Sequence, residues 1–276
     1  MEFAIAASCL DRFTFKDLLY ACTSLAVDGL ELSNRDGAQQ GTWSPELDHD
    51  HVLGLIRAAG QRVTAIAAWT DFVQPSAEAL EPQLTHVRQS VDLAIRYHCE
   101  IIRVLPGEPK PGIPEREWVP RIAAALREVL PYAEERGLLL ALQTHGRVVA
   151  NAGTALDILE AADSDNLKVT LDPAHFRSRG HDLEATRGCL EELLPHTAHV
   201  HLTDGVPGPG GSYHAVSVGE GDAPVELVVS SLLARAFARP LCFRYDGPLD
   251  PVEGLRRGIA YLRDLPRRIL EEAGLL

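Results

Sequence analysis

Several features that would mark other classes of protein are missing from this chain of 276 residues. No GxGxxG segment follows the first apolar run, which argues against a dinucleotide-binding fold. No apolar stretch approaches the ~20 residues that span a bilayer, so no membrane contact is expected. The first residues lack a basic region followed by a long apolar core, and we therefore expect no secretory signal.

Cysteine and positive charge are also scarce. The five cysteines have no CxxC spacing, which fits free thiols in a reducing compartment, so the cytoplasm is the expected location. Twenty-six Lys and Arg are outnumbered by thirty-nine Asp and Glu, and the formal net charge is -13. Such a surface repels polyanions on average, so nucleic acid is not an expected partner.

Apolar residues are plentiful, at 46% of the chain, and they are arranged in a regular alternation. Short runs rich in Val, Ile and Leu alternate with longer amphipathic stretches, which is the pattern of parallel strands covered by crossover helices. The length matches a single α/β barrel of about 250 residues. We therefore predict one domain over residues 1–276, a (β/α)8 TIM barrel, with strands near residues 3–7, 29–32, 63–68, 101–105, 138–143, 167–171, 198–202 and 241–245.

Eight helices are expected between and after these strands. Gly60 and Gly137 follow two of them and are suited to helix ends. Residues 106–114 and 206–211 are rich in Pro and Gly and are expected to form long loops over the barrel mouth. The helices are expected near residues 14–25, 48–59, 77–98, 116–136, 154–161, 183–194, 225–236 and 252–276.

Polar residues gather where the predicted strands end. In a TIM barrel these positions face a common mouth, where active sites lie. A small-molecule substrate is therefore the expected partner. The candidate residues are Glu31, Trp69, Arg103, Gln143, His145, Asp172, His175, His199, His201, Arg244 and Tyr245.

Several of the segments that contain these residues resemble those of the xylose-isomerase-like sugar-phosphate isomerases and epimerases. The resemblance extends over essentially the whole chain, and the order DPAH followed by HVHLTD is its most specific part. It implies the barrel fold, an isomerase or epimerase type of activity, and a possible homodimer or homotetramer. The resemblance rests on GLEL at 29–32, LQTHG at 142–146, LDPAH at 171–175, HVHLTD at 199–204, GEGD at 219–222 and FRYDG at 243–247.

The resemblance also implies a metal site, from which this sequence departs. Members of that superfamily hold Mn, Mg, Co or Zn with a Glu, an Asp, a His and a second Glu. Asp172 and His201 match this pattern, but Gln143 and Arg244 stand at the two Glu positions. Half of the expected ligands are therefore replaced.

Charge counting favours a site without metal. Gln143, Asp172, His201 and Arg244 sum to zero charge before any ion binds. A divalent cation about 4 Å from a guanidinium is opposed by about 8 kcal/mol at an effective dielectric constant of 20, and Arg does not deprotonate. We expect no cofactor and predict that Arg244 takes the place of the cation and pairs with Asp172. The alternative is a weak site for a divalent metal held by Asp172, His201 and Gln143.

The predicted function is proton transfer on a small hydroxylated or keto-bearing metabolite by an isomerase, an epimerase or a related lyase or cyclase. His145, Asp172, His175, His201 and Arg244 are the expected catalytic residues, because imidazoles transfer protons near neutral pH and a guanidinium stabilises an oxyanion. A metal-dependent sugar isomerase and a non-catalytic binding barrel remain the alternatives. The expected substrate-binding residues are Gln143, Glu31, Trp69, Arg103, His199 and Tyr245.

Each candidate also has a purely structural interpretation. Asp172 and Arg244 could form a buried ion pair without a catalytic role. For His199, a supporting role that positions His201 by hydrogen bonding is favoured over the substrate contact named above. The run from Asp48 to His51 is expected to be a solvated helix cap, and the helical histidines, His49 among them, are expected at the surface.

Overall fold

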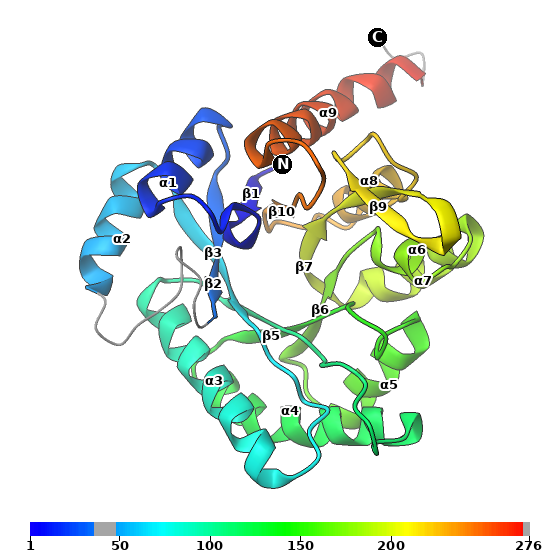
Figure 1. Ribbon diagram of the computed structural model, residues 1–276. Helices are drawn as coiled ribbons and strands as arrows, with labels where there is room; N and C mark the ends of the chain where they lie inside the picture. Colours follow the sequence, from blue (N-terminus) through cyan, green and yellow to red (C-terminus); the bar gives the residue numbers. More distant parts are fainter. Residues whose placement is uncertain (36–47, 273–276) are drawn as a thin grey trace.

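The computed structural model describes residues 1–35 and 48–272. Eight parallel strands close a barrel in the order β1-β10-β7-β6-β5-β4-β3-β2, with helices around it (Figure 1). This confirms the predicted TIM barrel. The strands are β1 (Phe3–Ala6), β2 (Gly29–Asn34), β3 (Arg62–Ala68), β4 (Ile101–Val104), β5 (Leu139–Gln143), β6 (Leu167–Leu171), β7 (Thr197–Leu202) and β10 (Leu241–Phe243).

The helices of the outer layer lie close to the predicted ranges, although the predicted end of the last helix at residue 276 lies outside the described residues. A short helix that was not predicted, α6 (His175–Ser178), follows β6, and short 3₁₀ turns occupy residues 7–10, 115–117, 194–196 and 209–211. The longer helices are α1 (Phe15–Ser24), α2 (His49–Ala58), α3 (Ala77–Arg96), α4 (Trp118–Glu134), α5 (Ala152–Ala162), α7 (Leu183–Leu193), α8 (Val225–Ala234) and α9 (Pro251–Glu272).

Side-chain caps fix the starts of most of these helices. Thr14 forms a capping box with Asp17, and Asp48 accepts a hydrogen bond from the backbone N of His51. Ser76, Asn151 and Asp182 cap α3, α5 and α7 in the same way. Each cap contributes about 1 kcal/mol to stability. The cap expected at the start of α2 is therefore present.

Two predictions of local structure were wrong. Residues 206–211 are not one loop, because β8 (Asp204–Pro207) and β9 (Tyr213–Val216) pair as an antiparallel hairpin beside the barrel mouth. His49 is not at the surface, because its Nδ1 lies 2.9 Å from the hydroxyl of Tyr97 and the ring is buried. The hairpin was missed because its strands flank a segment rich in Pro and Gly. The burial of His49 was missed because its partner, Tyr97, is distant in the sequence.

The apolar core lies between the barrel and its helices, whereas the barrel interior contains polar residues. Five polar side chains of the inner wall are at most 2% exposed. Among the described residues, no helix combines the length and the hydropathy needed to cross a bilayer. The buried polar residues of the inner wall are Glu31, Arg103, Gln143, His199 and His201.

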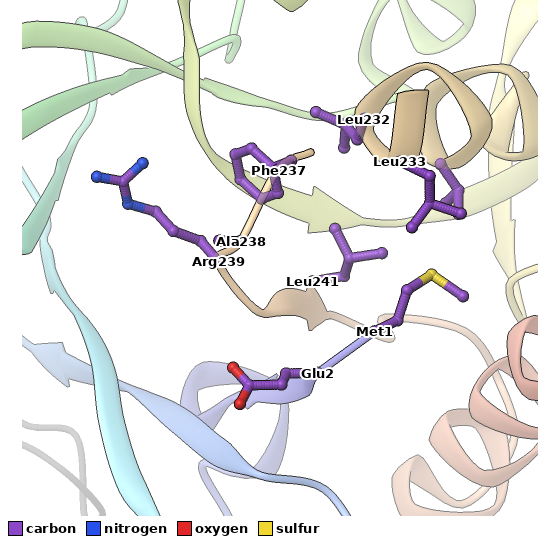
Figure 2. A pocket seen from close by; sticks show the side chains of 9 residues that line it. Met1, Glu2, Leu232, Leu233, Phe237, Ala238, Arg239 and Leu241 are labelled. Carbon is purple, nitrogen blue, oxygen red and sulfur yellow. The ribbon is translucent and has the colours of Figure 1, made fainter. Parts of the chain in front are cut away.

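An apolar crevice of about 200 Å³ opens at the N-terminal end of the barrel (Figure 2). Leu232, Leu233 and Phe237 face Leu241 and Met1 across it, and none of the predicted site residues lines it. In TIM barrels the N-terminal face serves stability rather than chemistry. The candidate site is therefore sought at the opposite end.

Candidate active site

A cavity of about 460 Å³ opens at the C-terminal ends of the strands. This volume is typical of pockets for small ligands. Four of the five predicted catalytic residues line it, namely His145, Asp172, His175 and Arg244. The loops after β5, β6 and β10 bring these four together.

Asp172 lies in the cavity wall with most of its carboxylate sheltered. Its Oδ1 accepts hydrogen bonds from the hydroxyl of Thr203 and from the backbone N of Ala174, which is 3.0 Å away. Burial raises the pKa of Asp172 to about 6, although these hydrogen bonds and the charge of Arg244 oppose the rise. A carboxyl group with such a pKa exchanges a proton readily near neutral pH.

Arg244 makes its ion pair with Asp246 rather than with Asp172. The guanidinium lies 2.8 Å from the Asp246 carboxylate, and both side chains line the cavity. The predicted direct pair between Arg244 and Asp172 was therefore wrong. Thr203 and Ala174 already provide donors to Asp172, and Asp246 is only two residues from Arg244 in the chain. Arg244 still acts on Asp172 through its charge.

Burial keeps both histidines of the cavity neutral. Nε2 of His175 lies 2.6 Å from the backbone oxygen of Val149, and burial lowers its pKa to about 4. Burial and then the charge of Arg244 lower the pKa of His145 to about 4. Its Nε2 lies 4.0 Å from Glu108. At pH 7 both rings are therefore neutral, and each can accept a proton only transiently.

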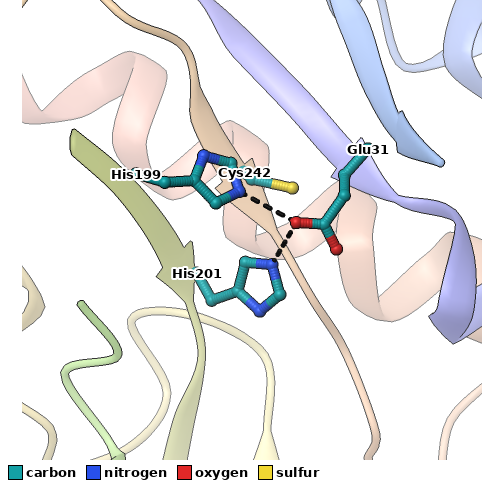
Figure 3. Close-up of side chains that lie close together, drawn as sticks. All are labelled: Glu31, His199, His201 and Cys242. Atoms are coloured by element: carbon teal, nitrogen blue, oxygen red, sulfur yellow. Dashed lines mark hydrogen bonds and ion pairs between the residues drawn. The ribbon is translucent and has the colours of Figure 1, made fainter. Parts of the chain in front are cut away.

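Below the mouth, Glu31 holds both histidines of β7. Its Oε2 lies 2.9 Å from Nε2 of His199 and 2.8 Å from Nε2 of His201 (Figure 3). Its Oε1 lies 3.3 Å from Nε of Arg103. Burial alone would raise the pKa of Glu31, but His201, Arg103 and the hydrogen bonds hold it well below its ordinary value. The carboxylate is therefore ionised, and each imidazole donates from Nε2.

The buried polar atoms without a hydrogen-bond partner in the part of the chain that the structure describes include two that lie close to the Glu31 network. They are Nδ1 of His201 and Nε2 of Gln143. Since Nε2 of His201 donates to Glu31, its Nδ1 carries a lone pair and accepts, whereas the Gln143 amide nitrogen donates. Buried groups of this kind usually have a partner. One acceptor and one donor suit a hydroxyl or carbonyl group, or a water molecule.

The four positions of the metal shell do not fit a divalent cation. Oε1 of Gln143, its possible ligand atom, accepts a hydrogen bond from Arg103. Arg244 brings a positive charge to the cavity that Asp172 lines. No negative charge other than that of Asp172 remains in the set. These residues therefore lack the anionic oxygens that such an ion requires.

A second group of ligand-type atoms lies deeper in the barrel. Each of four residues offers one atom that is able to bind a metal, and these atoms lie within 4.8 Å of one another. The residues are Glu31, His199, His201 and Cys242 (Figure 3). Hydrogen bonds to Glu31 already satisfy both imidazole Nε2 atoms. Burial raises the pKa of the Cys242 thiol well above its ordinary value. Both Nε2 atoms are thus engaged with the carboxylate of Glu31, and the thiol of Cys242 stays protonated.

Several predicted substrate-binding residues lie outside the cavity lining. Glu31, Arg103, Gln143 and His199 are buried in the barrel. Trp69 donates from Nε1 to Ser33, 2.7 Å away. A contact of these residues with substrate stays a prediction.

Tyr245 is also buried, and its hydroxyl accepts a hydrogen bond from the backbone N of Leu249. Sequence reasoning missed Arg147 and Arg179, which also line the cavity. The available signal was their position, since Arg147 directly follows LQTHG and Arg179 lies four residues after DPAH.

The fold agrees with the comparisons with known proteins. The profile of the xylose isomerase-like TIM barrel family matches residues 19–265. The chain therefore belongs to this family. A search of curated proteins found no sequence relative.

Many solved structures share the fold. A D-tagatose 3-epimerase-like protein has a TM-score of 0.79 and 18% identity, with 98% of this chain and 100% of that one covered. The IOLI protein, solved with a zinc atom, has a TM-score of 0.77 and 17% identity over 96% and 97%. A probable 3-DHS dehydratase, AsbF of Bacillus anthracis, has a TM-score of 0.73 and 16% identity over 95% and 99%. At these identities the likeness shows the fold alone.

Proposed function

We propose that this protein is an isomerase- or epimerase-type enzyme that moves a proton on a small hydroxylated or keto-bearing metabolite without a metal at the family's usual position. The observation that carries the proposal is that Arg244 and Asp172 line one cavity, with Asp172 ionising near pH 6. The epimerases and the dehydratase among the solved relatives support proton transfer as the class of reaction.

In this mechanism Asp172 exchanges the proton. Its pKa of about 6 makes it a usable base at neutral pH and a usable acid after it has accepted a proton. Removal of a proton beside a carbonyl group leaves negative charge on the carbonyl oxygen. Arg244 stabilises that charge, because its guanidinium is permanently protonated.

The buried residues orient the other end of the substrate. Glu31 fixes the proton of His201 on Nε2, so Nδ1 accepts a hydrogen bond from a substrate hydroxyl. The free amide nitrogen of Gln143 donates to a neighbouring oxygen. A hydroxyl next to a carbonyl provides both partners. These contacts make a ketose or a hydroxy-keto compound the best fit.

Exchange of hydrogen for deuterium tests the proposal without knowledge of the product. The purified protein is treated with EDTA, checked for metal by elemental analysis, and incubated in D2O with a panel of small ketoses and keto acids. Proton NMR follows the signal of the hydrogen beside each carbonyl group. We expect at least one compound to lose this signal with the metal-free protein.

Variants separate the proposed mechanism from its alternatives. Asp172→Asn and Arg244→Ala should each slow exchange by about 100-fold or more. Arg187→Ala, an exposed change on α7, should leave exchange unaltered. Exchange that stops with EDTA and returns with Mn²⁺ would instead support a metal-dependent isomerase. No exchange with any compound would support a binding barrel.

A further inference from the structure

The wall of the cavity contains positive charge for which the protein provides no counter-ion. Arg147 lies in the loop after β5 and Arg179 directly follows α6, and both line the cavity together with Arg244. Neither Arg147 nor Arg179 has a side-chain ion pair or hydrogen bond with any residue of the described ranges 1–35 and 48–272. Two guanidinium groups thus face the same space without acceptors.

Three of the four acidic residues of the same wall are already engaged, and the fourth, Glu108, lies 4.0 Å from Nε2 of His145. Asp204 accepts hydrogen bonds from four backbone N–H groups, and Asp246 pairs with Arg244. Asp172 accepts from Thr203 and Ala174. None of the four carboxylates pairs with Arg147 or Arg179, so these two guanidinium groups are left without an anionic partner among the described residues. A ligand that pairs with them has to supply anionic oxygens.

The charges of the arginines also act on the two histidines of the cavity. The charges of Arg244 and Arg179 both help to lower the pKa of His145, after the larger effect of burial. Arg179 acts on His175 in the same direction. The three arginines share the wall with four carboxylates, so the attraction of an anion rests on the two guanidinium groups without a partner and not on an excess of positive charge.

From these observations we infer that the substrate carries an anionic group, a carboxylate or a phosphate, that Arg147 and Arg179 bind at the rim of the cavity. Guanidinium groups bind both anions through paired hydrogen bonds. The anion lies at the rim, while the reacting carbon faces Asp172 and Arg244. That the bound molecule is a substrate rests on the proposed function. Binding of the anion itself does not depend on turnover.

Anion binding is measured by isothermal titration calorimetry of the intact protein with inorganic phosphate and with malonate. We expect one of the two to bind with a Kd in the millimolar range or tighter, and to bind about tenfold or more weakly in the Arg147→Ala/Arg179→Ala double variant. Higher KCl concentration should weaken binding, because salt screens exposed charges. Phosphate as the better ligand identifies a phosphorylated substrate, and malonate identifies a carboxylate.

The matched control is Arg187→Ala, which removes an exposed guanidinium of α7 that does not line the cavity. It should leave anion binding unchanged. The inference is overturned if neither anion binds, if the double variant binds as the unaltered protein does, or if Arg187→Ala weakens binding equally. Asp172→Asn should keep anion binding while losing deuterium exchange, so failure of the catalytic proposal can be told apart from failure of this one.

Discussion

Nε2 of His201 lies 2.8 Å from Oε2 of Glu31, and both residues are 1% exposed. The same carboxylate faces Arg103 through its other oxygen. Glu31 is therefore the only side chain that balances the charge of Arg103 by a direct ion pair among the described residues. The stability of the barrel interior and the orientation of His201 depend on one group.

Glu31→Gln should destabilise the protein by about 3 to 5 kcal/mol. The substitution leaves the Arg103 guanidinium buried without its counter-ion, which is the costly way to break a buried pair. Urea unfolding followed by circular dichroism measures the change. Glu184→Gln, at an exposed position of α7, should cost almost nothing. A loss below about 1 kcal/mol for Glu31→Gln would mean that Arg103 finds another acceptor.

The ring of His201 should remain neutral and carry its proton on Nε2. Burial lowers its pKa to about 4, against the attraction of Glu31. Two-dimensional ¹⁵N NMR of the imidazole rings between pH 5.5 and 8 distinguishes the two tautomers. We expect no titration in this range and the Nε2-protonated form. Protonation on Nδ1 would contradict the assignment of that atom as the acceptor in the site.

Stability should fall as the pH rises from about 4 to 6 because of Asp172. Its pKa is raised from 3.8 to about 6 in the folded state, so folding favours the protonated form. The contribution is complete below pH 3.8 and is lost as the pH rises through 6, with a limit of about 3 kcal/mol. Asp172→Asn removes this dependence and should make the protein more stable than the unaltered chain at pH 7.

Chemical denaturation at pH 4 and pH 7 measures this difference. The two proteins should be nearly equal in stability at pH 4 and separate at pH 7. Asp157→Asn, an exposed change on α5, serves as the control and should follow the unaltered chain at both pH values. An Asp172→Asn protein that is less stable at pH 7 would show that the carboxylate is stabilised as an anion.

Restoring the two missing carboxylates should create a metal site. The Gln143→Glu/Arg244→Glu double variant has the Glu, Asp, His and Glu set, whose charge of about -3 suits a divalent ion. We expect about one Mn²⁺ per chain by elemental analysis after dialysis, against none for the unaltered protein. Equal metal content in both proteins would contradict the interpretation of Arg244. A metal that is found in the unaltered protein but lost in Cys242→Ala would be held by the deeper group of Glu31, His199, His201 and Cys242.

Asp204 should hold the loop beside the mouth in place. Its carboxylate accepts hydrogen bonds from the backbone N of Gly205, Gly219, Gly221 and Ala223. Asp204→Ala should cost about 3 kcal/mol or more and speed amide hydrogen exchange at Gly219 and Gly221. Asp204→Asn keeps one oxygen acceptor, so its stability and its amide exchange rates should lie between those of the unaltered protein and Asp204→Ala. Unchanged exchange at these amides would show that other contacts fix the loop.

The alternation of apolar runs and helical stretches was enough to predict the barrel, because each strand and helix is a local pattern of residues. The antiparallel hairpin of β8 and β9 was missed. Its strands are only four residues long and flank a segment rich in Pro and Gly, which is also typical of irregular loops. The burial of His49 depends on Tyr97, 48 residues away, and no local pattern contains that contact.

For the candidate site, strand ends alone placed His145, Asp172, His175 and Arg244 at the mouth. The partners of these residues were harder to predict. Arg244 was expected to bind Asp172, but Thr203 and Ala174 provide hydrogen bonds that a sequence does not reveal. Glu31 was assigned to substrate, although the alternation of side chains along β2 and β7 also allows it to meet His199 and His201 inside the barrel.

The ionic network around Glu31 has a further consequence for substitutions at the mouth of the barrel. It lies in the barrel interior, whereas Arg244 sits on the loop above with a partner of its own. The ion pair that neutralises Arg103 in the interior is thus separate from the ion pair of Arg244 at the mouth. Replacement of Arg244 therefore leaves the charge balance beneath it intact.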